Sequence, residues 1–272
     1  MVFKIKKLIK NLIPSGILNF YYKIKHPYSF SGDFKNWEQA SLLSDGYDSN
    51  VILNKCRESL LKVKNSETVF ERDSALFDKI QYSWPIITGL MHCIAENNKE
   101  LHVLDFGGSL GSSYYQNKLL LSSINGLNMT WSIVEQNNFV ICGKNDFTDN
   151  SLAFYETTEA CFKERAPNVL LLSSVLQYLE SPYEWLNKFL SSSIEYVIFD
   201  RTAFIKSSDD MILLQKVSSA IYKASYPTWV FDENKFLKTL LDKYDIILEH
   251  ENTDFTNYKG MYFKGFVFKL KK

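Results

Sequence analysis

The stretch "HVLDFGGSLGSSYYQN" at residues 102–117 decides how the chain folds. An apolar run ends at Asp105, Gly107 and Gly108 follow, and Gly111 stands just before the chain turns apolar again. Glycine adopts backbone dihedrals that a side chain forbids, and it lets the backbone approach a ligand closely. We therefore expect a buried strand, a tight turn and a helix, with a binding site at the turn.

Short apolar runs and helical segments alternate from residue 101 to the C-terminus. The expected strands are 101–106, 130–135, 152–156, 168–174, 195–200, 244–250 and 261–270. The expected helices are 112–123, 137–144, 157–165, 182–192, about 209–223 and 232–242. This alternation, with the early strands apolar throughout, is typical of a doubly wound α/β fold whose parallel sheet is covered on both faces. A short turn at 252–260 separates the last two strands, so we expect them to pair antiparallel at an edge.

The segments upstream of residue 101 have a different rhythm. Residues 26–46 are rich in Ser, Gly, Asp and aromatic residues and are expected to form an ordered loop. Helical periodicity resumes over 48–64 and 68–96, with a bend at Pro85. The chain thus divides into a basic amphipathic helix at 1–25, a helical extension or lid at 26–100, and a ligand-binding domain at 101–272.

The N-terminal stretch "MVFKIKKLIKNLI" is amphipathic. At about 100° per residue, its aliphatic residues share one arc and its four lysines the other, with Phe3 alone out of place. Such a helix either lies on an anionic membrane surface or packs on its own domain with a solvated lysine face. Flotation with liposomes, with and without residues 1–25, distinguishes the two. No apolar run reaches the roughly 18 residues of a spanning helix, and the interspersed lysines are unlike a signal peptide.

The composition is that of an ordinary globular protein without a preferred charged partner. The 272 residues are 46% hydrophobic, and Lys plus Arg equal Asp plus Glu at 31 each. A neutral chain has no global field that attracts nucleic acid, so we expect no such partner. The four cysteines stand far apart without a C-x-x-C pair. They predict buried free thiols in a reducing compartment and no metal site.

The residues around the turn favour a cofactor that contains a nucleoside but no phosphate. Glu135 closes the second strand, where a carboxylate can accept hydrogen bonds from both hydroxyls of a ribose. Ser109 and Ser112 can cap the helix that follows the turn. Asp105 would repel the pyrophosphate of a dinucleotide, whereas it suits the positive groups of S-adenosylmethionine. We therefore predict S-adenosylmethionine as the cofactor; the alternative is a tight turn that binds nothing.

Several longer stretches carry a resemblance to a known family. They are "VLDFGGSLGSSYYQN", "WSIVEQ", "LLSSVLQYLESPYEWL", "FDRTAF" and "IYKASYPTW", with "GYD" and "FERDSALFDKIQYSWP" upstream. In this order, from about residue 30 to the C-terminus, the chain resembles a family of class I S-adenosylmethionine-dependent methyltransferases associated with surface-polysaccharide biosynthesis. The resemblance implies a Rossmann-like sheet of seven strands whose last strand is antiparallel.

The resemblance also implies which residues hold the cofactor. Asp105 and the glycines of the turn would surround the methionine part, Glu135 would hold the ribose, and the segment after the fourth strand would line the cofactor and face the acceptor. The residues expected at the cofactor are Asp105, Gly107, Gly108, Ser109, Gly111, Glu135, Gln136, Ser173, Ser174 and Gln177. The chain departs from common small-molecule methyltransferases at two points. An acidic residue followed by a small one is common after strand three, where this chain has Glu156 and Thr157, and Gln177 and Tyr178 replace a common Glu-His or His-His pair.

Methyl transfer to a hydroxyl benefits from a general base, for which the sequence offers few candidates. His102 begins the first strand, at the wrong end of the sheet, and His92 lies in an upstream helix, so both are expected to be structural. His250 ends the sixth strand. Asp200 ends the fifth expected strand and Arg201 follows it. We expect Asp200 to accept a proton or a substrate hydroxyl and Arg201 to orient an anionic group; alternatively, the pair braces the loop.

Aromatic residues are the expected wall of the acceptor pocket, because rings with polar edges suit the faces of sugars. The candidates are Tyr82, Tyr178, Tyr222, Tyr226 and Trp229. Three of them lie between the fifth and sixth strands, where insertions in this fold reach over the cofactor. Single aromatics are more often part of a core. The charged stretch from Glu71 to Asp73 is a solvated helix face unless that helix covers the site.

The sequence therefore predicts an S-adenosylmethionine-dependent methyltransferase that O-methylates a sugar or glycan intermediate in surface-polysaccharide biosynthesis. Its expected location is cytoplasmic, at the inner face of the membrane if the N-terminal helix binds there. The alternative is a catalytically silent protein of the same fold that binds or scaffolds a glycan assembly complex. A nicotinamide-dependent sugar oxidoreductase is the least favoured, because no Tyr-x-x-x-Lys pair follows the fourth strand.

Overall fold

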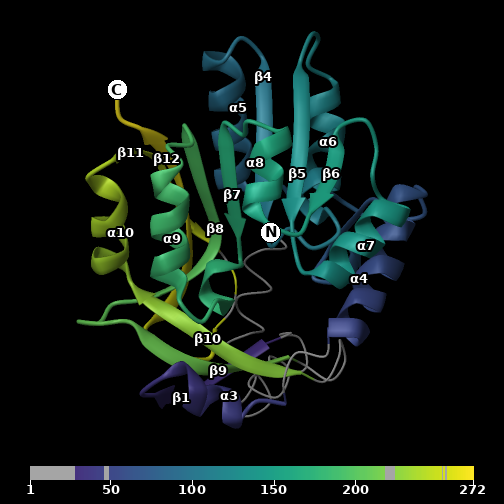
Figure 1. Ribbon diagram of the computed structural model, residues 1–272. Coiled ribbons are helices and arrows are strands. Elements are labelled where there is room, and N and C mark those ends of the chain that lie inside the picture. The colour runs from purple at the N-terminus through teal and green to yellow at the C-terminus, as the bar shows by residue number, and fades with distance from the viewer. Residues whose placement is uncertain (1–27, 46–48, 218–223, 253, 255) are drawn as a thin grey trace, which may run out of the picture.

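In the computed structural model, which describes residues 28–45, 49–217, 224–252, 254 and 256–272, ten strands form one sheet flanked by helices (Figure 1). Seven of these strands are the expected ones: β4 (Glu100–Phe106), β5 (Asn128–Val134), β6 (Leu152–Tyr155), β7 (Val169–Ser173), β8 (Tyr196–Ile205), β11 (Tyr244–Asn252) and β12 (Met261–Leu270). Five expected helices are also confirmed: α6 (Ser112–Ser122), α7 (Asn137–Asp146), α8 (Thr158–Glu164), α9 (Pro182–Ser191) and α10 (Glu233–Leu241).

The order of these seven strands is β6-β5-β4-β7-β8-β12-β11. The strands from β4 to β8 pair in parallel, and β12 is antiparallel to both of its neighbours. This is the doubly wound, Rossmann-like arrangement of class I methyltransferases, so the predicted fold class is confirmed. The last two strands pair antiparallel as predicted, but only β11 lies at the edge, because β12 inserts between β8 and β11.

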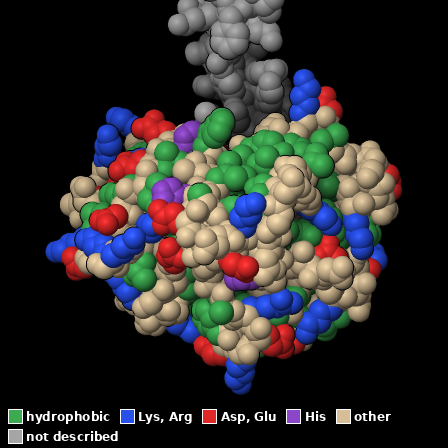
Figure 2. All heavy atoms as spheres, turned by 90° about the horizontal axis from the view of Figure 1, so that it is seen from above, with side chains coloured by type: hydrophobic (Ala, Val, Ile, Leu, Met, Phe, Trp, Pro, Cys, Tyr) green, Lys and Arg blue, Asp and Glu red, His purple; other side chains and the backbone are tan. Residues whose placement is uncertain are grey.

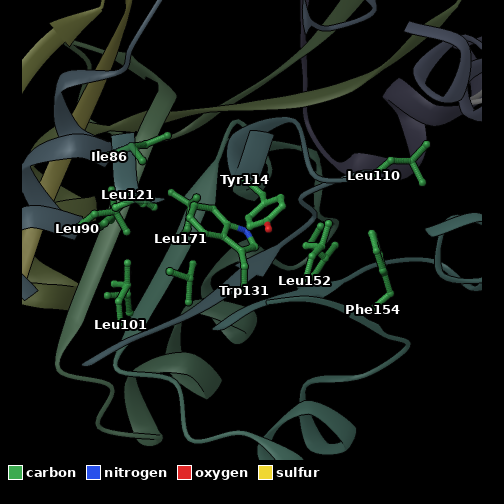
Figure 3. Packing of buried hydrophobic residues seen from close by; sticks show 14 of the residues in the cluster. Ile86, Leu90, Leu101, Leu110, Tyr114, Leu121, Trp131, Leu152, Phe154 and Leu171 are labelled. Atoms are coloured by element: carbon green, nitrogen blue, oxygen red, sulfur yellow. The ribbon is translucent and has the colours of Figure 1, made fainter. Parts of the chain in front are cut away.

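Side chains that alternate along the strands divide the core into two layers. Val103 and Leu171 belong to a cluster with residues of α6 and α7, whereas Leu104 and Leu170 belong to a cluster with residues of α8, α9 and α10. Burial on both faces explains why these strands are apolar throughout. Figure 3 shows Trp131 of β5 at the centre of the first cluster, beside the ring of Tyr114 from α6.

The chain upstream of β4 is only partly helical. Helix α4 (Ser49–Lys64) confirms the helix expected at 48–64, but the expected loop contains strand β1 (Tyr28–Phe34) and helix α3 (Trp37–Leu42). The prediction of one bent helix over 68–96 is wrong. Strands β2 (Phe70–Arg72) and β3 (Ala75–Phe77) form a hairpin, and α5 (Trp84–Glu96) begins after it. Pro85 stands in the first turn of α5, where a missing N–H is tolerated, and makes no bend.

The prediction of a helix at about 209–223 is wrong for the described residues of this range, which include a strand. Strand β9 (Met211–Val217) pairs antiparallel with both β10 (Ser225–Asp232) and β1. The apolar run of β9 is too short for its periodicity to distinguish a strand from a helix. Because β10 joins β8 in parallel at its last two residues, the three strands cross beyond the carboxyl ends of the parallel strands (Figure 1).

Two predictions fall on residues outside the described part of the chain, namely the amphipathic helix within 1–25 and the site residue Tyr222. Contact with a membrane through residues 1–25 therefore stays a prediction. Within the described ranges, no helix is both long and apolar enough to cross a membrane. Acidic and basic side chains are intermingled over the face shown in Figure 2, in keeping with the balanced charge of the chain.

Gly265 of β12 allows α5 to lie close to the sheet. A Cβ at this position would lie 2.4 Å from Cγ of Pro85 and 3.0 Å from the carbonyl oxygen of Phe199. We expect Gly265→Ala to lower the free energy of unfolding, measured with urea, by about 1–3 kcal/mol, because α5 has to move away from β12. Adding Pro85→Ala should relieve the contact, so the double variant should lose less than the sum of both losses. If the loss in the double variant equals the sum of the two single losses, the contact between Pro85 and Gly265 is contradicted.

Candidate active site

The carboxyl ends of β4, β5, β7 and β8 open into a cavity of about 1220 Å³. Parallel sheets of this kind bind ligands at this edge. The hairpin β2–β3 and parts of β9, β10 and β11 complete the walls. The structure brings thirteen of the predicted site residues into this lining: Tyr82, Asp105, Gly107, Gly108, Ser109, Glu135, Gln136, Ser173, Ser174, Tyr178, Asp200, Arg201 and Tyr226.

Three other predicted site residues are described but do not line this cavity. Gly111 precedes α6 with a φ of 108°, so it serves the turn itself. Gln177 is buried and donates from Nε2 to the carbonyl oxygen of Arg201 at 3.2 Å, which makes it a support beneath the site. Trp229 stacks on Trp37, with ring centroids 6.3 Å apart, beside a separate cavity of about 290 Å³.

Gly108 lies against the buried carboxyl group of Asp105. A Cβ on Gly108 would come within 2.5 Å of Cγ of Asp105, so only glycine allows the turn to lie this low. Trp131 Nε1 donates to Oδ2 of Asp105 at 3.0 Å, while Oδ1 has no hydrogen-bond partner within the described chain. Burial raises the pKa of Asp105 to about 7, and the charge of Glu135 adds to this rise. A positively charged ligand group would stabilise the ionised form.

Glu135 follows β5, the strand next to β4. Its Oε2 accepts a hydrogen bond from the backbone N–H of Gln136 at 2.8 Å, and burial raises the pKa of its carboxyl. The residue lines the cavity beside the turn that holds Gly107 and Gly108. This places a carboxylate where the hydroxyls of a ribose can donate to it.

Asp200 and Arg201 lie in a gap between two strands. Strand β7 pairs with β8 as far as Ser173, opposite Asp200, and β10 pairs with β8 only from Phe231, opposite Phe204. The expectation that Asp200 ends its strand is wrong, because β8 continues to Ile205 along β12. The gap exposes the middle of β8 to the cavity, which explains how residues within a strand come to line it.

The carboxyl group of Asp200 is held by three donors from three elements. Ser83, the residue before α5, donates to Oδ1 at 2.8 Å, and Asn252 at the end of β11 donates to the same oxygen at 3.3 Å. Ser173 donates to Oδ2 at 3.2 Å. With an exposure of only 3%, Asp200 joins these elements at the floor of the cavity.

The guanidinium group of Arg201 is paired with the hairpin. Its Nη1 donates to Oδ2 of Asp73 at 2.9 Å. Burial opposes the positive charge, but the carboxylates of Asp73, Asp254 and Asp200 outweigh it and hold the pKa of Arg201 well above its ordinary value. An anionic group of a ligand would therefore compete with Asp73 for this guanidinium.

Glu71 lies inside the site, which the sequence pattern did not indicate. The expected helix would have placed it on a charged surface, whereas the hairpin leaves it only 3% exposed in the cavity wall. The hydroxyl of Ser112 donates to Oε1, and the backbone N–H of Ser74 donates to Oε2 at 3.1 Å. Burial raises the pKa of Glu71 to about 7. The Asp-Ser dipeptide at 73–74 was the available signal, since such residues favour tight turns.

Non-glycine residues with a left-handed backbone gather at this cavity. Asp73, Ser74, Ser109, Ser174 and Arg201 all line it and have φ values between 50° and 66°. Each such conformation costs on the order of 1–3 kcal/mol and persists only where the surrounding structure enforces it. Their concentration in one wall is typical of a functional site.

Two tyrosines form an aromatic corner of the cavity. The rings of Tyr178 and Tyr226 meet edge to face, with centroids 5.3 Å apart. The hydroxyl of Tyr178 donates to Oε1 of Gln215 at 2.9 Å. Gln215 belongs to β9, and the helix expected in this region did not indicate that its side chain lies at the cavity. Tyr82, at 38% exposure, lies at the opening.

Among the described histidines and cysteines, only His250 and Cys56 line the cavity. His102 contacts Thr130 and Glu100 at the opposite end of the sheet, as expected of a structural residue, while His250 lines the cavity. The described cysteines are free, and burial raises the pKa of Cys56, which lines the cavity, to about 11. No group of His, Cys, Asp and Glu in the described ranges could hold a metal ion.

Several solved structures are similar to this chain at low sequence identity. No protein-family model and no curated protein matches it. The N-terminal domain of EvdMO1, crystallised in the presence of SAH and D-fucose, is 13% identical, with a TM-score of 0.47 over 83% of this chain and 98% of that one. A SAM-dependent methyltransferase from Methanosarcina mazei is 9% identical, with a TM-score of 0.46 over 70% and 99%. Likenesses this weak decide neither cofactor nor substrate, and the fold rests on the strand order.

The buried Glu71 makes stability depend on pH. Its ordinary pKa is 4.5, so between pH 4.5 and about 7 the folded protein keeps a proton that the unfolded chain has released. The free energy of unfolding therefore falls as the pH rises through this range. We expect Glu71→Gln to remove about 1–3 kcal/mol of that fall, measured by urea denaturation at pH 5 and pH 8. Glu67→Gln, at an exposed position before the hairpin, is the control. An unchanged pH dependence in Glu71→Gln would refute this role.

Proposed function

We propose that this chain is an S-adenosylmethionine-dependent methyltransferase that O-methylates a sugar or glycan intermediate of surface-polysaccharide biosynthesis. The cofactor assignment is supported above all by the contact between Gly108 and the buried carboxyl of Asp105, whose Oδ1 has no partner in the described chain. A buried polar atom without a partner is costly, so a ligand that satisfies it gains affinity.

The residues at this end of the sheet fit S-adenosylmethionine. The ammonium and sulfonium groups suit the carboxyl of Asp105, and the ribose hydroxyls suit Glu135 one strand away. A dinucleotide fits less well, because its pyrophosphate would lie close to Asp105 and Glu71, both of them buried carboxyls. When bound, the cofactor supplies a methyl group activated by the positive sulfur.

The acceptor would lie over β7, β8 and β10. Tyr178 and Tyr226 present ring faces and hydroxyls of the kind that recognise sugars. In our assignment the acceptor hydroxyl would take the methyl group that the bound cofactor supplies, and Asp200 would receive the hydroxyl proton. Arg201 orients an anionic group of the acceptor in competition with Asp73. Correct positioning accounts for much of the catalysis in such a displacement.

One observation favours a second candidate function. The carboxyl of Asp200 already accepts hydrogen bonds from Ser83, Ser173 and Asn252, so it links three separate parts of the chain. The second candidate is a catalytically silent protein of the same fold that acts as a binding or scaffold subunit of a glycan assembly complex. Such a protein would need the hydrogen bonds to Asp200 only for its stability.

Calorimetry at pH 8 tests the cofactor assignment. We expect the protein to bind S-adenosylmethionine, S-adenosylhomocysteine and methylthioadenosine, which lacks the amino-acid end. Asp105→Asn should weaken the first two by about 10- to 100-fold and leave methylthioadenosine nearly unchanged, because the carboxylate contacts the charged end. Glu135→Gln should weaken all three, since each contains the ribose. If the protein binds none of the three ligands, the enzyme proposal fails.

Transfer of labelled methyl groups tests the acceptor. Glycan extracts from cells that lack the protein would serve as substrate, and mass spectrometry would locate the added methyl group on a sugar oxygen. Asp200→Asn should bind the cofactor normally but slow the transfer by about 100-fold or more, as expected for loss of a general base. Normal turnover in this variant would exclude Asp200 as the base, and a wild-type protein that binds cofactor without transfer would favour the silent alternative.

A further inference from the structure

The carboxyl group of Glu71 faces the first turn of α6. Ser112 is the first residue of this helix, and its hydroxyl donates to Oε1, while the backbone N–H of Ser74 donates to Oε2 at 3.1 Å. Both hydrogen-bond donors are neutral. Burial raises the pKa of Glu71 more than the charge of Arg201 lowers it, and this guanidinium is paired with Asp73. A buried carboxylate with neutral donors is costly, and a further cation beside it lowers that cost.

A second buried carboxyl flanks the same turn. Gly108 covers Asp105, and the N–H of Gly111 donates to the carbonyl oxygen of Gly108 at 3.0 Å, so residues 108–111 form one tight unit. Asp105 is 1% exposed, lines the cavity, and has an unpartnered Oδ1 within the described chain. The tight turn thus lies between two buried carboxyls that come from distant parts of the sequence.

The N-terminus of α6 supplies the complementary polarity. The residue that precedes this helix is Gly111, and no side chain in the described structure caps it. The first N–H groups of a helix without a cap attract an anion, and the helix dipole strengthens that attraction. A negative group at α6 and a positive group at Glu71 would therefore be stabilised side by side.

A zwitterionic α-amino acid carries these two charges on a single carbon. We infer that Glu71 binds the ammonium group of the cofactor's amino-acid end, while its carboxylate lies at the N-terminus of α6. The inference rests on the proposed S-adenosylmethionine function and assigns one end of that ligand to the hairpin β2–β3. The hairpin is thereby part of the cofactor site in addition to covering it.

The rigidity of the hairpin supports this role. Its turn residues Asp73 and Ser74 both have a left-handed backbone, with φ values of 52° and 66°, and Asp73 is tied to Arg201. The rings of Phe70 and Phe77 pack across its two strands, with centroids 5.6 Å apart. A carboxylate on a fixed support loses little entropy when it binds a charged group.

A comparison of two ligands tests the inference at pH 8. The ligands are S-adenosylhomocysteine and its analogue in which hydrogen replaces the α-amino group. We expect the wild-type protein to prefer the parent compound by about 10-fold or more, as a charge-assisted hydrogen bond implies. Glu71→Gln should weaken the parent by about 10- to 100-fold and change the analogue by less than about 3-fold. Glu67→Gln should behave like the wild type, and thermal unfolding would verify that all three proteins are folded.

The outcomes separate this inference from the proposed function. If the wild-type protein binds neither ligand nor S-adenosylmethionine, the proposed function fails. If the wild type binds S-adenosylhomocysteine and Glu71→Gln binds it equally well, Glu71 is not part of the ammonium site. Equal weakening of both ligands by Glu71→Gln would also overturn the inference, because it would indicate a structural effect of the hairpin without recognition of the amino group.

Discussion

The approach of Gly108 to the buried carboxyl of Asp105 is the constraint on which the site depends. Any side chain at position 108 would lift the turn away from the carboxyl. The same carboxyl accepts a hydrogen bond from Trp131, the ring at the centre of one core layer (Figure 3). Core packing therefore fixes the orientation of the group that faces the ligand. This arrangement buries the carboxyl of Asp105 where its charged form is disfavoured. A cationic ligand would offset that cost.

The parallel strands could be predicted from the sequence because burial on both faces makes each a continuous apolar run. The elements that were predicted wrongly lack such a local signal. Strand β9 is an apolar run of seven residues that becomes a strand by pairing with β1 and β10, and the hairpin β2–β3 has strands of three residues around an Asp-Ser turn. Their structure is decided by partners far away in the sequence, which periodicity does not reveal.

The site divides in the same way. The proximity of the residues proposed for the cofactor could be predicted, because Asp105, the glycines and Glu135 lie on one strand–turn–helix unit and the next strand. The residues proposed for the acceptor are brought together by contacts between distant segments. Asp200 was identified, but its donors come from the start of α5 and the ends of β7 and β11. Glu71 was missed as a site residue because its position depends on the hairpin.

The chain as a whole is neutral, but the lining of its cavity is acidic. The carboxyl residues in its lining are Glu71, Asp73, Asp105, Glu135, Glu156, Glu159, Asp200, Glu251 and Asp254, whereas the lysines and arginines are Arg72, Lys188 and Arg201. Two of these cations are already engaged, Lys188 with Glu159 at 2.7 Å and Arg201 with Asp73 at 2.9 Å. Field lines concentrate in a cleft with low-dielectric walls, so this excess disfavours a pyrophosphate group beside Asp105. The proposed preference for a phosphate-free, positively charged cofactor therefore rests on the whole wall, in which Asp105 is the most deeply buried acidic residue.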